Sequence, residues 1–148
     1  MIKTLTIGKW KIEGASFMEA TKSDATFKIK LAPELPHDAD LTVSIPDFGL
    51  PTVKDTRSMV AAMERHNHVF MGCMGGIGRT GTMIGCVLQS YRAKRRKTLG
   101  YKFNKLFRRT RKTDPEFHPA DPVEWVRKNF KSHAIETDEQ EAFVREFN

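Results

Sequence analysis

The stretch that decides the fold is Val69-Phe70-Met71-Gly72-Cys73-Met74-Gly75-Gly76-Ile77-Gly78-Arg79-Thr80-Gly81-Thr82. It begins with a short, wholly apolar run, which is typical of a strand buried on both faces. A glycine-rich turn follows, and then apolar residues recur at the spacing of one buried helical stripe: Met83, Ile84, Val87, Leu88 and Tyr91. A glycine loop between a buried strand and a helix predicts an α/β fold with a ligand site at the carboxyl end of that strand.

The flanking segments favour the same fold. Residues 4–7, 27–31 and 41–45 alternate apolar and polar side chains and predict three half-exposed strands. Three further helices are predicted over 53–66, from Pro122 and from Thr137, with capping residues at Thr52, Asp121 and Thr137. We therefore expect one domain over residues 1–148, with a central, mostly parallel sheet of four to five strands flanked by helices.

Composition limits the class of protein. The chain has 148 residues, of which 39% are hydrophobic and 29% charged, as in an ordinary globular domain. The first residues hold no continuous apolar run, and no stretch of about 18 apolar residues could span a membrane. Two cysteines are too few for a disulfide framework, so a cytoplasmic location is expected.

The net charge of +7 is concentrated in one segment. From Arg92 to Lys112 there are eleven Lys or Arg residues and no acidic ones, and subtracting them leaves −4 for the rest of the chain. Three interpretations stay open for this basic segment: a solvated helix face, a docking surface for an acidic phosphoprotein or a nucleic acid, and a surface for lipid headgroups.

The glycine loop has the features of an anion site. A loop that enters a helix N-terminus directs backbone N–H groups and the positive end of the helix dipole at an anion. Gly75, Gly76 and Gly78 let successive amides turn inward, and Arg79 can add a bidentate contact to two oxygens. Cys73 lies at the mouth of this positive field, which favours a nucleophilic thiolate. The predicted phosphate-binding residues are Met74, Gly75, Gly76, Ile77, Gly78 and Arg79, and Thr80 is expected to donate to the sulfur.

Three other interpretations compete with this one. A nucleotide-binding P-loop needs glycine where Cys73 stands and lysine where Arg79 stands, so that pattern fails at two positions. A tight structural turn with an inert, buried cysteine is the second. The third is a phosphate-binding module without chemistry, which the loop by itself leaves open.

The Cys-x5-Arg-Thr pattern, here with Gly-Arg-Thr-Gly, resembles the signature loop of the protein tyrosine and dual-specificity phosphatase superfamily. The resemblance implies a phosphatase fold, Cys73 as the nucleophile that forms a phosphocysteine, and Arg79 as the phosphate clamp, with no metal or other cofactor. One residue departs from the family pattern. The family usually has a histidine before the cysteine that supports the thiolate, and Gly72 stands there in this chain.

Two more segments extend the resemblance. Ile45-Pro46-Asp47-Phe48-Gly49-Leu50-Pro51 resembles the family's mobile acid loop, which implies that Asp47 is the general acid. Alone, this segment favours a turn in which Asp47 merely caps the backbone, and the acid role is favoured only together with the glycine loop. Residues 134–140 resemble the start of the family's last helix, where a glutamine, here Gln140, positions the hydrolytic water. Thr137 and Gln140 also have the spacing of a capping box, and both interpretations are kept.

The function expected from the resemblance is hydrolysis of protein phosphotyrosine, and also of phosphoserine or phosphothreonine. The short chain has no recognisable loop of the kind that sets phosphotyrosine depth in larger tyrosine-specific enzymes, so the compact, dual-specificity-like branch is favoured. An RNA 5′-phosphatase of the same superfamily is the alternative enzyme. A pseudophosphatase that captures phosphorylated partners is the alternative without catalysis.

Overall fold

The computed structural model describes residues 1–98 and 121–148. Five strands form one sheet in the order β1-β2-β5-β3-β4. Central strand β5 runs parallel to both of its neighbours, β3 also runs parallel to β4, and the β1–β2 hairpin is antiparallel. The predicted α/β fold with a mostly parallel sheet is therefore confirmed. The strands are β1 (Lys3–Ile7), β2 (Trp10–Ser16), β3 (Phe27–Lys30), β4 (Leu41–Thr42) and β5 (His68–Cys73).

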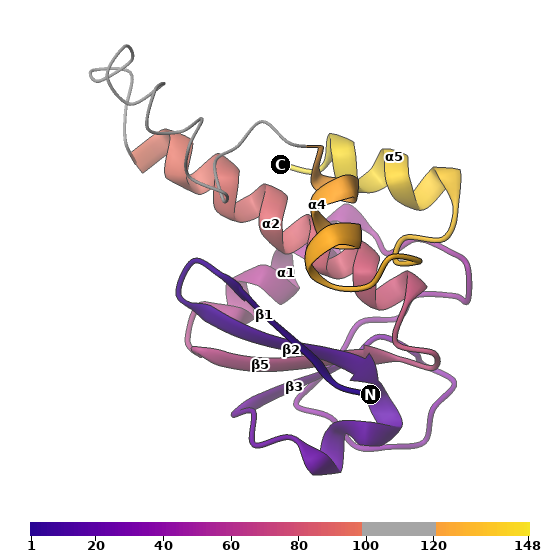
Figure 1. The fold of residues 1–148 in the computed structure, drawn as a ribbon. Helices are drawn as coiled ribbons and strands as arrows, with labels where there is room; N and C mark the ends of the chain where they lie inside the picture. The colour runs from indigo at the N-terminus through magenta and orange to yellow at the C-terminus, as the bar shows by residue number, and fades with distance from the viewer. Residues whose placement is uncertain (99–120) are drawn as a thin grey trace.

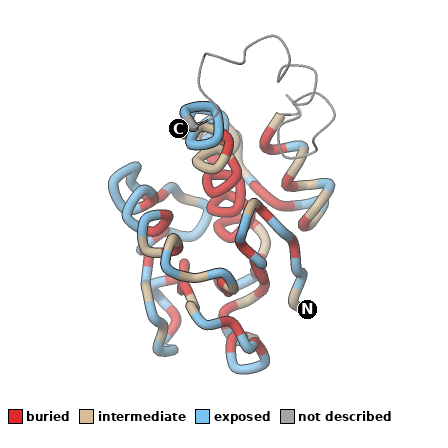
Figure 2. The backbone as a smooth tube through the Cα atoms, turned by 90° about the vertical axis from the view of Figure 1, so that its left-hand side faces the viewer, coloured by how far each residue is buried: buried red, intermediate tan, exposed pale blue. Residues whose placement is uncertain are grey.

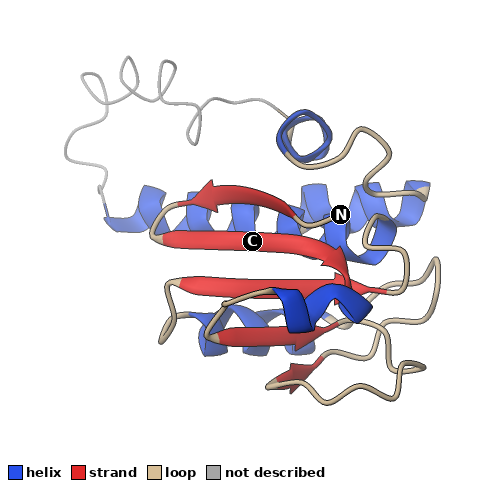
Figure 3. Cartoon of the chain, turned by 60° about the horizontal axis from the view of Figure 1, so that its bottom comes forward, coloured by secondary structure: helices blue, strands red, loops and turns tan. Residues whose placement is uncertain are grey.

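The helices flank this sheet. Figure 1 shows α2, α4 and α5 together on one side of the strands, and in Figure 3 the short 3-10 helix η1 lies in front of the sheet, opposite α1 and α2. The predicted N-caps are present, since Thr52, Asp121 and Thr137 each accept a hydrogen bond from a backbone N–H three residues on. The bounds are η1 (Phe17–Lys22), α1 (Val53–Met63), α2 (Gly78–Thr98), α4 (Pro122–Asn129) and α5 (Asp138–Glu146).

Several predicted bounds are wrong. The strand predicted over 41–45 ends at Thr42, although Val43 and Ile45 stay buried and the Val43 N–H still donates to the Lys30 carbonyl at 2.9 Å. Helix α1 ends at Met63, before the predicted end near His66.

Strand β2 was not predicted, because Ile12, Glu13, Gly14 and Ala15 are all buried and the sequence shows no alternation. The buried Glu13 carboxylate is satisfied by the Ser23 hydroxyl and by Nε2 of His68 at 3.0 Å, which explains how a charge is tolerated in this strand.

Helix α2 links the sheet to the C-terminal helices. Residues 78–88 are buried, and Figure 2 shows this burial giving way to exposure toward the far end of the helix. The predicted stripe is confirmed at Met83, Ile84, Val87 and Leu88, which have no exposed surface, while Tyr91 is half-buried.

Gly81 and Gly85 lie one turn apart in α2, and the C-terminal segment packs directly against them. A Cβ on Gly81 would lie 2.6 Å from the Ala134 Cβ, and a Cβ on Gly85 would lie 2.7 Å from Val144. Residues 134–144 are thus docked on the helix that begins at the glycine loop.

The basic segment is described only in part. Its beginning is the C-terminal end of α2, where residues 94–97 are exposed, which agrees with the predicted helical start. Residues 99–112, including the predicted break at Gly100, lie outside the described residues. Within residues 1–98 and 121–148, no helix has the length and apolar character needed to cross a membrane.

Candidate active site

The glycine loop closes around the sulfur of Cys73. Strand β5 ends at Cys73 and helix α2 begins at Gly78, so four residues make the connection. The Sγ of Cys73 accepts hydrogen bonds from the Gly76 N–H at 3.2 Å and from the Thr80 hydroxyl at 3.1 Å. The sulfur therefore faces the inside of the loop, and the donor expected at Thr80 is in place. Two donors are thus directed at one sulfur.

The curl of the loop depends on close contact with the end of β2. Gly76 has φ +71°, and a Cβ there would lie 2.2 Å from the carbonyl carbon of Ala15. A Cβ on Gly72 would lie 2.6 Å from the Ala15 oxygen and 2.7 Å from the Phe17 nitrogen. These neighbours are backbone atoms, which cannot swing aside. This contact explains why glycine stands where the family usually has histidine.

The guanidinium of Arg79 is buried and held from one side. Its Nη1 donates to Glu34 Oε2 at 3.1 Å and to the Ile45 carbonyl at 2.9 Å, and its Nη2 donates to Glu34 Oε1 at 2.7 Å. A guanidinium has five N–H groups, so these contacts leave the Nε–H and one Nη2–H for two phosphate oxygens. The arrangement fits the predicted phosphate clamp.

Glu34 was not predicted as a site residue. It lies in the loop after β3, where no spacing or motif connects it to a residue 45 positions later. The loop itself is organised by the buried Lys30, whose ammonium donates to the Leu35 carbonyl at 2.7 Å and to the His37 carbonyl at 2.8 Å.

The Arg79–Glu34 pair is ionised throughout the neutral range. The hydrogen bond from Arg79 holds the pKa of Glu34 below its usual range. Burial by itself lowers the pKa of Arg79, but the hydrogen bond to Glu34 and the facing Cys73 and Asp47 outweigh burial and raise the pKa overall. Because the Glu34 pKa is lowered, the contribution of the pair is present above the ordinary glutamate pKa and is lost only as the pH falls through the lower value.

Asp47 lies beside this cation in the acid loop. Its Oδ1 is 3.6 Å from Arg79 Nη2, and its side chain is 67% exposed. The same Oδ1 accepts the Phe48 N–H at 3.1 Å, and the Gly49 N–H donates to the Pro46 carbonyl at 2.8 Å. Asp47 thus both caps a turn and pairs with Arg79, so the two interpretations of this segment are compatible. Phe48 has φ +58° and is 60% exposed, an unusual conformation for a bulky residue.

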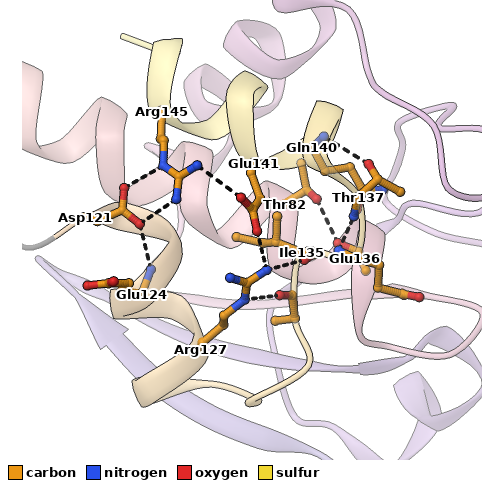
Figure 4. A network of polar contacts seen from close by, with 12 residues as sticks. Thr82, Asp121, Glu124, Arg127, Ile135, Glu136, Thr137, Gln140, Glu141 and Arg145 are labelled. Atoms are coloured by element: carbon orange, nitrogen blue, oxygen red, sulfur yellow. Dashed lines mark hydrogen bonds and ion pairs between the residues drawn. The ribbon is translucent and has the colours of Figure 1, made fainter.

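Gln140 forms the predicted capping box with Thr137. The Thr137 hydroxyl accepts from the Gln140 N–H at 3.1 Å, and Gln140 Oε1 accepts from the Thr137 N–H at 3.3 Å (Figure 4). The side chain has no exposed surface, and its Nε2 donates to the Gly49 carbonyl in the acid loop at 3.1 Å. Water positioning by Gln140 stays a prediction.

The second cysteine, Cys86, lies in the buried part of α2. Burial raises the pKa of the Cys86 thiol, which keeps it protonated and unreactive. It is a core residue, as the sequence indicates.

Comparison with protein families decides the classification. Residues 22–144 match the sequence profile of the family described as "Swiss Army Knife protein, DSP-PTPase phosphatase domain". The chain belongs to this family. It is thus a phosphatase domain of the dual-specificity and protein tyrosine phosphatase superfamily, as the Cys-x5-Arg-Thr loop predicts.

Two curated relatives match about three quarters of the chain. "Uncharacterized protein MJ0215" and "Uncharacterized protein MJECL20" of Methanocaldococcus jannaschii are 32% and 31% identical over 111 residues, 72% of this phosphatase chain. The chain spans 54% and 58% of their lengths, little more than half of each protein.

Two of the similar solved structures show the same fold at low identity. Tk-PTP in its active form superposes with a TM-score of 0.65 at 21% identity and covers 98% of this chain and 94% of its own. Kinase associated phosphatase superposes with a TM-score of 0.64 at 15% identity, and the match covers 99% of this chain and 92% of that phosphatase chain. Both support the fold of this phosphatase domain.

The Glu34 contact generates a first prediction. Replacing Glu34 with Gln removes the charge that fixes one edge of Arg79, so the guanidinium is free to leave its phosphate-facing orientation. We expect the affinity for vanadate to fall about tenfold, which corresponds to about 1.4 kcal/mol. Isothermal titration of the folded variants measures this affinity. Asp38→Asn, the same charge change in the same loop, serves as the control, and equal loss in both variants would contradict the role of Glu34.

Proposed function

We propose that this phosphatase domain hydrolyses protein phosphotyrosine, and more slowly phosphoserine and phosphothreonine, through a phosphocysteine on Cys73. One observation carries the proposal. The sulfur of Cys73 accepts two hydrogen bonds inside the glycine loop, while the free edge of the Arg79 guanidinium and the carboxylate of Asp47 lie at the same loop. A nucleophile, an anion clamp and an acid are the groups that metal-free phosphoryl transfer needs.

An aryl substrate is supported by the apolar side chains on the two active-site loops. Phe48 and Leu50 of the acid loop are 60% and 39% exposed, and Met74 of the glycine loop is 46% exposed. Exposed apolar side chains that flank an anion site favour a substrate with an apolar group next to its phosphate. The phenyl ring of phosphotyrosine has this character, and the 5′ end of an RNA is more polar.

In the first step, the Cys73 thiolate attacks phosphorus opposite the ester oxygen. The S–P bond forms and the P–O ester bond breaks, while Asp47 transfers its proton to the leaving oxygen. Inward backbone N–H groups of residues 74–79 and the Arg79 guanidinium hold the three remaining oxygens. Thr80 stabilises the sulfur through its hydroxyl, which is 3.1 Å from Sγ.

In the second step, water attacks the phosphocysteine. Asp47, now a carboxylate, takes a proton from this water as the O–P bond forms. The S–P bond breaks, inorganic phosphate leaves and the Cys73 thiolate is restored. The Thr80 hydroxyl donates to the departing sulfur, so the same contact assists both steps.

Substrate class is tested by assaying a phosphotyrosyl peptide and a 5′-phosphorylated RNA side by side without added metal. We expect faster release of phosphate from the peptide, and a loss of at least about 10³-fold in Cys73→Ser. Cys86→Ser is the matched control and should retain activity, because that thiol lies buried in α2. Faster turnover of the RNA would favour the RNA 5′-phosphatase, and activity that survives Cys73→Ser would remove Cys73 from the mechanism.

The role of Asp47 is tested by leaving-group dependence. Asp47→Asn keeps the shape of the side chain and removes the proton. An alkyl phosphate needs that proton because its alkoxide is a poor leaving group, whereas p-nitrophenolate leaves unaided. We expect kcat/KM to fall about 10²-fold for the alkyl phosphate and much less for p-nitrophenyl phosphate. Equal slowing of both substrates would argue against the acid role.

A further inference from the structure

Gln140 connects the C-terminal segment with the acid loop. Its Oε1 accepts hydrogen bonds from the Glu136 N–H at 2.9 Å and the Thr137 N–H at 3.3 Å, and its Nε2 donates to the Gly49 carbonyl at 3.1 Å. The side chain is fully buried, so these contacts do not compete with bulk water. A single amide thus connects the backbone before α5 with the acid loop, whose Gly49 lies 91 positions before Gln140 in the sequence.

The C-terminal end of this connection is fixed. Arg127 donates to the carbonyls of Ala134 at 3.0 Å and Ile135 at 2.8 Å and also binds Glu141 at 2.6 Å (Figure 4). Gly81 of α2 contacts Ala134 so closely that a Cβ would clash. Gln140 is therefore held against α2, the helix that follows the glycine loop and carries Arg79 in its first turn.

The acid loop is attached on both sides of Asp47. On the N-terminal side, the Ile45 carbonyl accepts from Arg79 Nη1 at 2.9 Å. On the C-terminal side, the Gly49 carbonyl accepts from Gln140. Asp47 itself is exposed and touches Arg79 only through an ion pair at 3.6 Å. Two carbonyl anchors therefore flank Asp47 in the acid loop, one at Ile45 and one at Gly49.

We propose that Gln140 is a positioning residue that holds the acid loop, through Gly49, so that Asp47 reaches the leaving oxygen. The proposal rests on the proposed role of Asp47 as the general acid. It differs from water positioning, because it assigns Gln140 to the step in which the ester bond breaks and not to hydrolysis of the phosphocysteine.

The test is Gln140→Glu, which keeps the accepting oxygen of the side chain and replaces the donating nitrogen. A glutamate keeps an oxygen that accepts from the 136 and 137 N–H groups, and it is itself a preferred residue of the capping box. Its other oxygen, when ionised, has no proton to donate to the Gly49 carbonyl. Gln89→Glu is the matched control, since Gln89 Nε2 also donates to a backbone carbonyl, that of Arg145 at 3.2 Å. Gln140→Met removes the donor without adding charge.

The first measurement tests whether Gln140 anchors the acid loop, and it does not depend on phosphatase activity. Hydrogen exchange of the backbone amides in residues 45–52 should be faster in Gln140→Glu and Gln140→Met than in the parent protein, and unchanged in Gln89→Glu. Unchanged exchange in the two Gln140 variants would overturn the proposal even in a protein that lacked phosphatase activity. This readout therefore separates failure of the anchor from failure of the proposed function.

The dependence of kcat/KM on the leaving group then tests whether Gln140 acts in the step that breaks the ester bond. We expect both Gln140 variants to lower kcat/KM for an alkyl phosphate about tenfold more than for p-nitrophenyl phosphate, as partial loss of the general acid requires. In an Asp47→Asn background, Gln140→Glu should change kcat/KM less than about twofold, because both substitutions remove the same contribution. Full additivity of the two substitutions would overturn the proposal.

Two other results would also overturn it. A burst of product followed by a lower kcat, with kcat/KM unchanged for every leaving group, would assign Gln140 to the hydrolytic water. If the Gln140 variants and Thr137→Ala all had lower thermal stability and unchanged kinetics, Gln140 would serve only as part of the helix cap.

Discussion

The site depends on backbone packing between the glycine loop and the end of strand β2. At Gly72 and Gly76 the chain lies so close to Ala15 and Phe17 that neither position has room for a Cβ. This contact fixes the left-handed conformation at Gly76, whose N–H donates to the Cys73 sulfur. It also leaves no room for a side chain at position 72, where the family usually has a histidine. Here the sulfur is held by the Gly76 amide and the Thr80 hydroxyl.

The charges of the site are arranged around one buried cation. Arg79 is bound on one edge by Glu34 and by the Ile45 carbonyl, which leaves the other edge for phosphate oxygens. A buried guanidinium without such partners would be costly, and a mobile one would be a poor clamp. The Ile45 contact also joins Arg79 to the acid loop, so in the mechanism that we propose, binding of the anion and delivery of the proton share one framework. On our account Gln140 completes that framework from the other side.

Much of the fold and of the site could be predicted from the sequence, and the errors have physical causes. The strand, loop and helix from Val69 to Leu88 have strong local signals, because a doubly buried strand, a glycine loop and a helical stripe each have a distinct pattern. Strand β2 has no such pattern, since its buried run Ile12-Glu13-Gly14-Ala15 is neither alternating nor wholly apolar. The partners that make Glu13 tolerable there lie elsewhere in the chain. Glu34 and the Gly49 contact of Gln140 are equally hidden, because both depend on tertiary pairing over 45 and 91 positions.

The central claim is that the sulfur of Cys73 carries the phosphoryl group during turnover. Rapid acid quenching of the Asp47→Asn variant with p-nitrophenyl phosphate, followed by peptide mass spectrometry, tests this claim directly, because the first step can proceed with this leaving group while the second is slowed. We expect one phosphoryl group per chain, located on Cys73. Release of p-nitrophenol with no phosphorylated peptide, or with the phosphoryl group on another residue, would contradict it.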